Sequence, residues 1–300
     1  MDLSIIIVNW NTSHLLERCL NEICLYPPSC SFEVFVIDNA STDDSVFLLK
    51  TKFAWVHLIE NQENVGFAKA NNQAIWASAG EYVLLLNSDA FVQPDALQYL
   101  LNNMRANPDT GVCGPMLLND DQTFQASFAD FPSLWHEIIH QLGLAKYLIS
   151  PNYPSYAYNH SLIQQKVDWV GGACMMVRRQ AIVQAGMLNE SFLMYGEEME
   201  WCYRIKQCGW QIIFCPDAKV THLGGQSSTA IPDWKYIQIQ KGKVLFFAQS
   251  YSKFSAKALE IIIRLINFAK MIVCFVYKQF HNDAEQRFHV YWKVARAKLL

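Results

Sequence analysis

The chain has 300 residues, of which 52% are hydrophobic and 17% are charged, and its formal net charge is −3. The charged fraction lies below the roughly 25% that is usual for soluble domains, and the slight negative charge excludes the broad basic surface that binds DNA or RNA. The length suffices for one large domain or for a domain with an appendage.

Nine cysteines are scattered along the chain without any Cys-x-x-Cys pair. This pattern favours reduced thiols, buried as small apolar residues in a cytosolic protein, over a zinc site. The N-terminus lacks the basic segment and the long apolar run of a signal peptide, and no stretch is long and uncharged enough to span a membrane. The sequence therefore predicts a cytoplasmic location.

The first hundred residues alternate between strand-like and helix-like segments. Continuous apolar runs predict strands at 4–8, 33–37, 56–60 and 83–86, and helix-start signals or helical spacing follow each of them. Such runs are typical of parallel strands that are buried on both faces. The alternation predicts an α/β fold, Rossmann-like and doubly wound, with a mostly parallel central sheet.

Polar residues gather where three of these strands end. They are Asn9, Asn11, Asp38, Asn39, Asn87 and Asp89. Ligands of doubly wound sheets bind beyond the carboxyl ends of the strands, so these residues predict a binding site there.

Within this group, Asp89 is a candidate ligand for Mg or Mn, which prefer oxygen ligands and bind substrate phosphates at the same time. The alternative for Asp89 is a turn or a helix cap. Asp38 is placed to accept hydrogen bonds from a base or a ribose, and Gly66 would let the backbone approach a nucleotide closely. Neither a GxGxxG nor a GxxxxGK[ST] motif is present.

The middle of the chain, 119–165, is rich in aromatic residues, His, Asn and Pro. It fits a loop-rich insertion at an acceptor site and a peripheral helical excursion equally well. Regular structure is expected again as a strand at 167–177, in which Gly171 and Gly172 mark a bulge or a close approach to a ligand.

A helix expected at 197–208 begins with the acids Glu197, Glu198 and Glu200. Acids at this end of a helix are explained by the helix dipole alone. A carboxylate placed here could also take the proton from an acceptor hydroxyl, and neighbouring acids raise one another's pKa, which suits a base near neutral pH. His222 follows predicted strands at 211–215 and 218–222, and it is either structural or part of a mixed nitrogen and oxygen site that suits Mn.

The end of the chain is apolar and basic, with helices expected at 241–250 and 257–280. A basic amphipathic helix in a membrane interface fits this mixture. The alternative is a helix packed on the catalytic domain or on a second subunit.

Seven stretches of the chain together resemble the inverting family 2 glycosyltransferases of the GT-A type, in particular their rhamnosyltransferase-like branch. They are SIIIVNWN (4–11), VIDNASTD (36–43), NQENVGFAKANNQAI (61–75), VLLLNSDA (83–90), VGGACMMVRR (170–179), FLMYGEEMEWCYRIKQCGW (192–210) and THLGGQSS (221–228). They occur in the order of the family and span residues 4–228, so the joint signal is strong although each motif alone is weak.

The resemblance implies a GT-A-type nucleotide-diphospho-sugar transferase fold over residues 1–235. Its donor-binding half would cover about 1–115 and its acceptor and catalytic half about 116–235. The remainder, 236–300, would form a C-terminal helical region, for which a membrane contact and a contact with a partner subunit both stay open.

The resemblance also implies roles for single residues. Asp89 and His222 would hold the divalent metal, Glu198 would be the catalytic base with Glu197 beside it, and Asp38 would contact the nucleotide base. The full set of implied donor residues is Asn9, Asn11, Asp38, Asn39, Asn64, Gly66, Asn71, Asn87 and Asp89. The implied acceptor residues are Gly171, Gly172, Glu200 and Arg204.

Three departures from the family pattern bear on function. The metal motif begins with Asn87, the acid pair has Glu198 in place of Asp, and the Gln-x-x-Arg-Trp motif of processive members is missing. The last departure favours the addition of one sugar or a few. The pair leaves open whether Glu197 or Glu198 is the base.

The expected function is therefore metal-dependent, inverting transfer of one sugar in cell-surface polysaccharide biosynthesis. The expected partners are a dTDP- or UDP-sugar donor, a glycan or polyprenyl-linked acceptor, the inner face of the cell membrane and a second copy in a homodimer, but no nucleic acid. The alternatives are a catalytically degenerate protein that binds sugar nucleotides, and a nucleotidyltransferase, which would carry a Gly-rich basic loop after the first strand.

Overall fold

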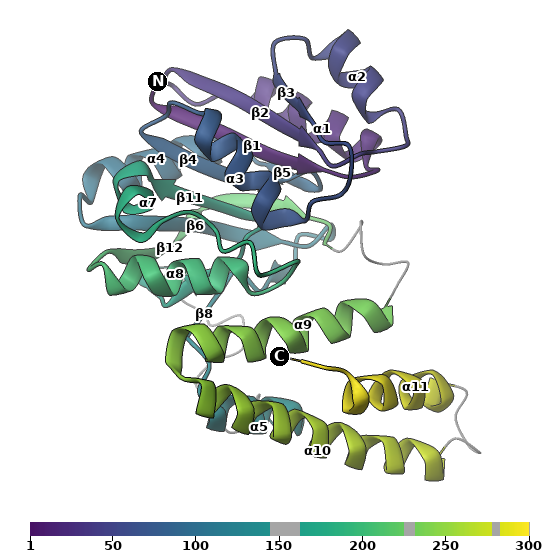
Figure 1. The fold of residues 1–300 in the computed structure, drawn as a ribbon. Coiled ribbons are helices and arrows are strands. Elements are labelled where there is room, and N and C mark those ends of the chain that lie inside the picture. Colours follow the sequence, from purple (N-terminus) through teal and green to yellow (C-terminus); the bar gives the residue numbers. More distant parts are fainter. Residues whose placement is uncertain (145–162, 225–231, 278–282, 300) are drawn as a thin grey trace.

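The structure is a computed structural model that describes residues 1–144, 163–224, 232–277 and 283–299. Its centre is a sheet whose main strands run in the order β3-β2-β1-β4-β11-β6-β12-β5 (Figure 1). The bounds of these strands are β1 Leu3–Asn9, β2 Phe32–Asp38, β3 His57–Glu60, β4 Tyr82–Asn87, β5 Ala90–Val92, β6 Thr110–Leu118, β11 Cys174–Arg178 and β12 Gln211–His222. Short strands β7 Phe124–Gln125 and β9 Gln165–Lys166 pair with β6 and β12.

The sheet is mostly parallel, as expected. Strands β1, β2, β3 and β4 form one parallel group, and β6 pairs in parallel with β12. Strand β11 runs antiparallel between these groups, and β5 runs antiparallel to β12 at the edge. In this register Asn9 lies opposite Asp38 and Val8 opposite Asn87, so the polar ends of β1, β2 and β4 meet at one edge.

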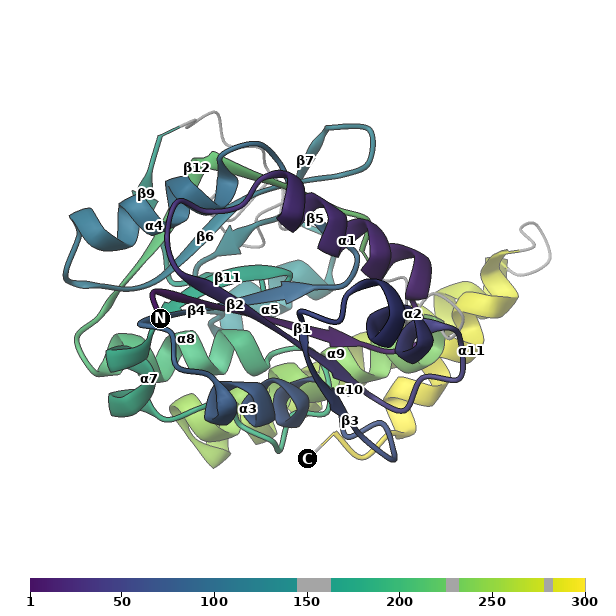
Figure 2. The same cartoon turned by 90° about the horizontal axis from the view of Figure 1, so that it is seen from above.

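Helices cover both faces of the sheet (Figure 2). One face packs against α1 Ser13–Leu25 and α4 Ala96–Ala106, whose buried residues are mostly leucines at helical spacing. The other face packs against α3 Phe67–Ala77, α7 Arg179–Ala185 and α8 Glu197–Gln207. The short helix α2 Ser45–Lys52 follows β2. Five of the nine cysteines are buried and all nine are free thiols.

Two strand predictions need correction. The strand expected at 167–177 is divided into β10 Trp169–Val170 and β11, because the chain turns at Gly171 and Gly172. Strand β10 leaves the main sheet and pairs with β8 Phe128–Ala129. The central strand β6 was missed, since its interior contains Gly114 and Pro115, residues that normally interrupt strands.

The described part of the middle segment combines short strands with one helix. It forms β7, β8 and the helix α5 Leu134–Gln141, while residues 145–162 lie outside the described ranges. Helix α5 packs on the C-terminal helices through an ion pair of 2.8 Å between Glu137 Oε2 and Lys243 Nζ. Gln141 also donates a hydrogen bond of 2.8 Å to Gln240.

The C-terminal helices are part of a third core rather than a loose appendage. They are α9 Pro232–Phe246, the π-helical turn η1 Phe247–Tyr251, α10 Lys253–Tyr277 and α11 Asp283–Arg296. Phe246 and Phe247 pack there with Phe192 and with Met199 of α8. The boundary expected after residue 235 falls inside α9, and the end of the helix expected at 257–280 lies beyond the described residues. None of the helices in the described ranges combines the length and the apolar character needed to cross a membrane.

Candidate functional site

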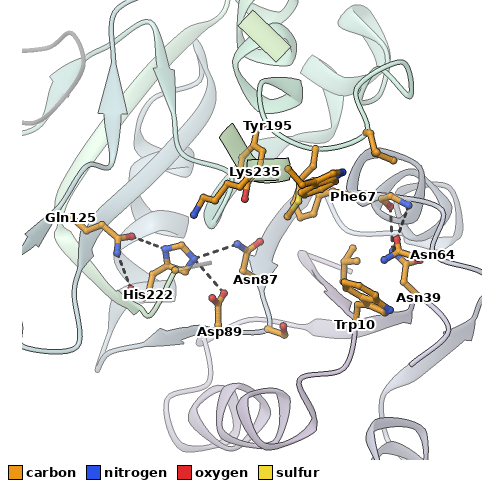
Figure 3. Close-up of a pocket in the computed structure, with 17 residues that line it drawn as sticks. Trp10, Asn39, Asn64, Phe67, Asn87, Asp89, Gln125, Tyr195, His222 and Lys235 are labelled. Carbon is orange, nitrogen blue, oxygen red and sulfur yellow. Dashed lines mark hydrogen bonds and ion pairs between the residues drawn. The ribbon is translucent and has the colours of Figure 1, made fainter. Parts of the chain in front are cut away.

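A cavity of about 710 Å³ opens at the edge of the sheet where the polar strand ends meet (Figure 3). Six of the residues predicted for the site line it, namely Asn39, Asn64, Gly66, Asn87, Asp89 and His222. Eleven more lining residues were not predicted for the site, among them Trp10, Phe67, Gln125, Tyr195, Trp234 and Lys235.

Asp89 and His222 face each other although they lie far apart in the sequence. Strand β12 pairs antiparallel with β5, which places His222 opposite Ala90. The Leu223 amide donates a hydrogen bond of 3.1 Å to the Asp89 carbonyl and secures this crossing. As a result, Oδ1 of Asp89 lies 3.3 Å from Nε2 of His222, and both side chains are largely buried.

Gln125 of β7 determines which nitrogen of His222 faces Asp89. The Gln125 amide nitrogen donates hydrogen bonds of 2.9 Å to the His222 carbonyl and to Oδ1 of Asn119. The side-chain oxygen of Gln125 is therefore the atom that can accept a hydrogen bond from the His222 ring. That oxygen lies 2.6 Å from Nδ1 of His222, which therefore carries a proton and donates it. With Nδ1 bonded to Gln125, Nε2 is the ring nitrogen that faces Asp89, which is the arrangement of a histidine that ligates a metal through Nε2.

The donor set at this place fits a divalent cation. A carboxylate and a neutral imidazole lone pair repel each other at 3.3 Å unless a proton or a cation lies between them. In an octahedral ion with bonds of about 2.1 Å, neighbouring ligand atoms are about 3 Å apart. In the described parts of the chain, no group of three or more His, Cys, Asp or Glu side chains could hold a metal.

Asn87 and Ser88 border this pair. The Asn87 amide nitrogen lies 3.5 Å from Nε2 of His222. The Ser88 hydroxyl is 2.9 Å from the Thr12 hydroxyl, which donates in turn to Asn9, so Ser88 ties the end of β4 to the start of α1.

Asp38 and Asn9 lie beneath the cavity rather than on its surface. One carboxylate oxygen of Asp38 accepts a hydrogen bond of 2.9 Å from the Asn9 amide, and the other accepts one of 2.8 Å from the Ser41 backbone. Asp38 is buried and does not line the cavity. This placement favours a role in shaping the loops rather than the base contact that the resemblance implies.

Two further residues that were predicted to bind the sugar donor also hold the fold instead of lining the cavity. Asn11 has a left-handed backbone with φ 54° and binds the backbone of Thr42. Asn71 is buried in α3 and donates to the carbonyl of Phe67 within the same helix. Neither residue lines the cavity.

Asn39, Asn64 and Gly66 form a connected rim on the opposite side of the cavity from His222. The Asn39 amide donates to Oδ1 of Asn64 and to the Gly66 carbonyl, each over 3.3 Å. Gly66 has φ 85°, and an added Cβ would lie 3.1 Å from the Leu193 carbonyl oxygen. The missing side chain at Gly66 therefore lets this rim contact the turn that precedes α8.

The two acids at the start of α8 differ in burial. The turn before them places Tyr195 and Gly196 in the left-handed region, with φ of 71° and 101°. Glu197 is 5% exposed, and its Oε2 atom has no hydrogen-bond partner among the described residues. Burial and the neighbouring Glu198 raise the pKa of Glu197 well above its usual range.

Glu198 is half-buried and accepts a hydrogen bond of 3.2 Å from the Gly196 backbone. Burial also raises the pKa of Glu198. Neither acid lines the cavity itself, whereas Tyr195 just before them does.

The predicted acceptor residues divide into two groups. Gly172 faces Glu198, since an added Cβ would lie 3.5 Å from Glu198 Cβ, and Gly171 precedes it. Arg204 instead forms an ion pair of 2.7 Å with Glu200 and donates to the carbonyls of Ala185 and Met187. These bonds connect α8 to the end of α7, and neither Glu200 nor Arg204 lines the cavity, so their placement does not support acceptor binding.

The sequence holds little that would have marked the unpredicted lining residues as part of the site. Trp10 stands in the first motif between two predicted asparagines and is 39% exposed at the cavity. Gln125 and Lys235 come from segments described only as an insertion and as the start of a helical tail. No local pattern marks them, because strand pairing and helix packing bring them to the cavity.

Comparison with known proteins identifies the family. The profile of "Glycosyl transferase family 2" matches residues 4–184. The chain is 25% identical over 268 residues to an N-acetylglucosaminyl-diphospho-decaprenol L-rhamnosyltransferase of Mycobacterium tuberculosis, covering 83% of this chain and 85% of the relative. It is 28% identical over 225 residues to the low-salt glycan biosynthesis hexosyltransferase Agl10 of Haloferax volcanii, covering 74% of this chain and 67% of that protein.

Solved structures agree on the fold. The mannosyltransferase PcManGT from Pyrobaculum calidifontis, in complex with GDP-Man and Mn²⁺, has a TM-score of 0.57 at 14% identity, covering 97% of this chain and 84% of that one. GalNAc-T7 with UDP, GalNAc and Mn²⁺ has a TM-score of 0.58 at 17% identity, covering 82% of this chain and 47% of that one. The fold is GT-A-like, and the family profile spans more than half of the sequence. The chain belongs to glycosyl transferase family 2 and is a glycosyltransferase, as its motifs predicted.

Proposed function

We propose that this glycosyltransferase moves one sugar, with inversion at the anomeric carbon, from a dTDP- or UDP-sugar to a hydroxyl of a glycan or polyprenyl-linked acceptor. The observation that carries the proposal is the Asp89–His222 pair, held in a metal-ligating arrangement by Gln125 at the edge of a nucleotide-sized cavity. The mycobacterial relative, whose name specifies rhamnose and a diphospho-decaprenol acceptor, supports rhamnose transfer in cell-surface polysaccharide biosynthesis.

A divalent ion, Mg²⁺ or Mn²⁺, would be held by Asp89 and His222 and would stabilise the negative charge of the departing diphosphate. Mn²⁺ in two structures of the same fold supports this assignment. Asn87, beside His222, would donate its amide hydrogens to donor oxygens.

The other end of the cavity suits the nucleoside. The half-exposed Trp10 ring offers a stacking surface for a base, and Asn39 and Asn64 offer amide groups beside it (Figure 3). Asp38 would act through the loop that it holds, by its bond to the Ser41 backbone.

Glu198 is the proposed base. It is more exposed than Glu197 and it faces Gly172, where the missing side chain leaves room for an acceptor. Its carboxylate would take the proton from the acceptor hydroxyl while the acceptor oxygen bonds to the anomeric carbon and the nucleoside diphosphate leaves from the opposite side. A pKa raised by burial suits this proton transfer near neutral pH.

A donor screen tests the proposal. Purified protein, Mn²⁺ or Mg²⁺, dTDP- and UDP-sugars and a polyprenyl-diphosphate-linked acceptor should give a product in which NMR shows the inverted anomeric configuration. A retained configuration would exclude the single displacement. Donor binding without transfer to any acceptor or to water would favour the catalytically degenerate alternative.

We further propose that α10 lies on an anionic lipid surface. Its exposed side carries a stripe of large apolar residues at helical spacing, namely Phe254, Ile261, Leu265, Phe268, Ile272, Val273, Phe275 and Val276. The opposite side is buried in the third core through Leu259, Ile263 and Asn267. One side of the helix thus packs on the protein, and the open apolar side supports the proposed lipid contact.

The charge of the C-terminal region favours an anionic lipid surface over a second copy of the chain as the partner of this exposed stripe. Residues 253–300 hold nine Lys and Arg against three Asp and Glu, whereas the whole chain is net negative. Two copies of such a basic region would repel each other, while anionic headgroups attract each Lys or Arg by about 1 kcal/mol. A membrane position would also bring the cavity near a polyprenyl-linked acceptor.

A further inference from the structure

The first C-terminal helix, α9, forms one wall of the cavity. Its residues Trp234 and Lys235 line the cavity, opposite the strand ends. Further along α9, Gly242 touches the turn before α8 so closely that an added Cβ would lie 2.0 Å from the Tyr195 carbonyl oxygen. The same turn leads directly into Glu197 and Glu198, so the position of α9 is tied to that of the catalytic acids.

Lys235 is a half-buried cation in this wall. Its Nζ atom lies 5.9 Å from the centre of the Tyr195 ring, which also lines the cavity. In the described ranges Lys235 forms no ion pair with a carboxylate, unlike Lys243 on the same helix, which pairs with Glu137. In Figure 3 its amino group points into the cavity, toward the side where Asn87 and His222 are drawn.

We propose that Lys235 binds the diphosphate group of a substrate, an inference that rests on the proposed glycosyl transfer. A diphosphate is the strongly anionic part of both expected substrates, and a partly desolvated ammonium that pairs with no carboxylate of the described ranges is suited to it. A divalent ion held by the Asp89 carboxylate would leave one net positive charge there, so a diphosphate needs a further cationic group from elsewhere in the cavity. The C-terminal helices thereby supply part of the binding site and are not only a membrane contact.

The diphosphate could belong to the donor or to a polyprenyl-diphosphate acceptor, and binding measurements distinguish these sources. The variant K235M removes the charge and keeps much of the side-chain volume, and K235R restores the charge. The control is K241M, on the same helix but outside the cavity lining. Calorimetric titrations with Mn²⁺ would use inorganic pyrophosphate, UDP, uridine and, after saturation with UDP, geranyl diphosphate.

If Lys235 contacts the donor, K235M weakens binding of UDP and pyrophosphate by about 10-fold or more, and uridine binding stays the same. If it contacts the acceptor, UDP binding is unchanged and binding of geranyl diphosphate to the UDP complex falls by about as much. In either case K235R recovers most of the loss and K241M stays within twofold of the wild type.

The proposal is overturned if K235M binds pyrophosphate, UDP and geranyl diphosphate within twofold of the wild type while its circular dichroism is unchanged. That result would leave the proposed transferase function standing. Conversely, if the wild-type protein fails to bind nucleotides but binds pyrophosphate through Lys235, the assignment of Lys235 survives and the proposed donor class does not.

Discussion

His222 donates a hydrogen bond from Nδ1 to the side-chain oxygen of Gln125 over 2.6 Å, and its other ring nitrogen thereby faces Asp89. Strand β7 thus supplies a residue of the cavity lining that holds the histidine ring through Nδ1. Hydrogen bonds of this kind hold a ligating imidazole in one orientation and raise its basicity. The consequences of this contact can be measured.

Replacing Gln125 with Leu should lower the affinity for Mn²⁺ by about 10- to 100-fold, because His222 loses the group that fixes its tautomer. Electron paramagnetic resonance of free Mn²⁺ measures this affinity. Q125E, which still accepts the Nδ1 proton, should retain affinity. The control Q184L alters a glutamine that accepts a hydrogen bond from Trp210 and does not line the cavity, and it should have no effect. An unchanged Mn²⁺ affinity in Q125L would refute the role of Gln125.

Replacing Glu198 with Gln should lower kcat by about 10²- to 10⁴-fold, the usual contribution of a general base. Donor affinity should stay within twofold, since Glu198 does not line the cavity. The wild-type rate should fall as the pH drops through the pKa of Glu198, and burial places this fall above the usual glutamate range. If E198Q keeps its rate and E197Q loses it, Glu197 is the base.

Replacing Glu197 with Gln should stabilise the protein at neutral pH by about 1–3 kcal/mol, because the amide cannot ionise, whereas the fold disfavours an ionised carboxylate whose Oε2 atom has no hydrogen-bond partner among the described residues. Since the folded pKa of Glu197 is raised, ionisation of this carboxyl favours the unfolded chain at every pH above the unfolded-state pKa. The gain should therefore be present at neutral pH and vanish as the pH falls toward the unfolded-state pKa, about 4.3. Urea denaturation at several pH values measures it.

The matched control for this stability test is E200Q. Glu200 is equally buried but pairs with Arg204 over 2.7 Å, so E200Q should destabilise the fold. A stabilising effect of both substitutions, or of neither, would contradict the assignment of burial as the cause.

Replacing Gly242 with Ala should destabilise the protein and reduce transfer. In an unobstructed helix this change stabilises by about 1 kcal/mol. Here the new Cβ would meet the Tyr195 carbonyl at 2.0 Å, so α9 and the turn before Glu197 must separate. A lower melting temperature together with a higher KM for the donor is expected, and a higher melting temperature would show that the contact is not formed.

Replacing Leu265 and Phe268 with Glu should abolish binding to vesicles that contain anionic lipid. These residues are 64% and 52% exposed on α10, so the fold should be unaffected. The control V183E changes a residue of α7 that is 78% exposed, and it should leave vesicle binding unchanged. If the α10 variant instead converts a dimer into a monomer without changing vesicle binding, the stripe is a subunit interface.

The sequence predicted the parallel strands of the sheet better than it predicted which residues line the cavity. Apolar runs correctly located β1, β2, β3 and β4, since buried parallel strands need such runs. The same reasoning missed β6, because Gly114 and Pro115 interrupt its pattern while neighbours on both sides hold the strand in place. The strand expected at 167–177 failed at its glycines, which end β10 rather than bulge within a longer strand.

The order of residues along the chain by itself determined the α/β alternation, the strand-end acid Asp89, the helix-start acids and the family, because each of these is a local pattern. Only the tertiary structure decided which polar residues face the cavity and which face the interior. Asp38 and Asn71 are buried and bond to neighbouring groups, and Asn11 stays exposed but holds the backbone of Thr42 rather than lining the cavity. Gln125 and Lys235 reached the cavity through strand pairing and helix packing, and such long-range contacts leave no periodic signal in a single sequence.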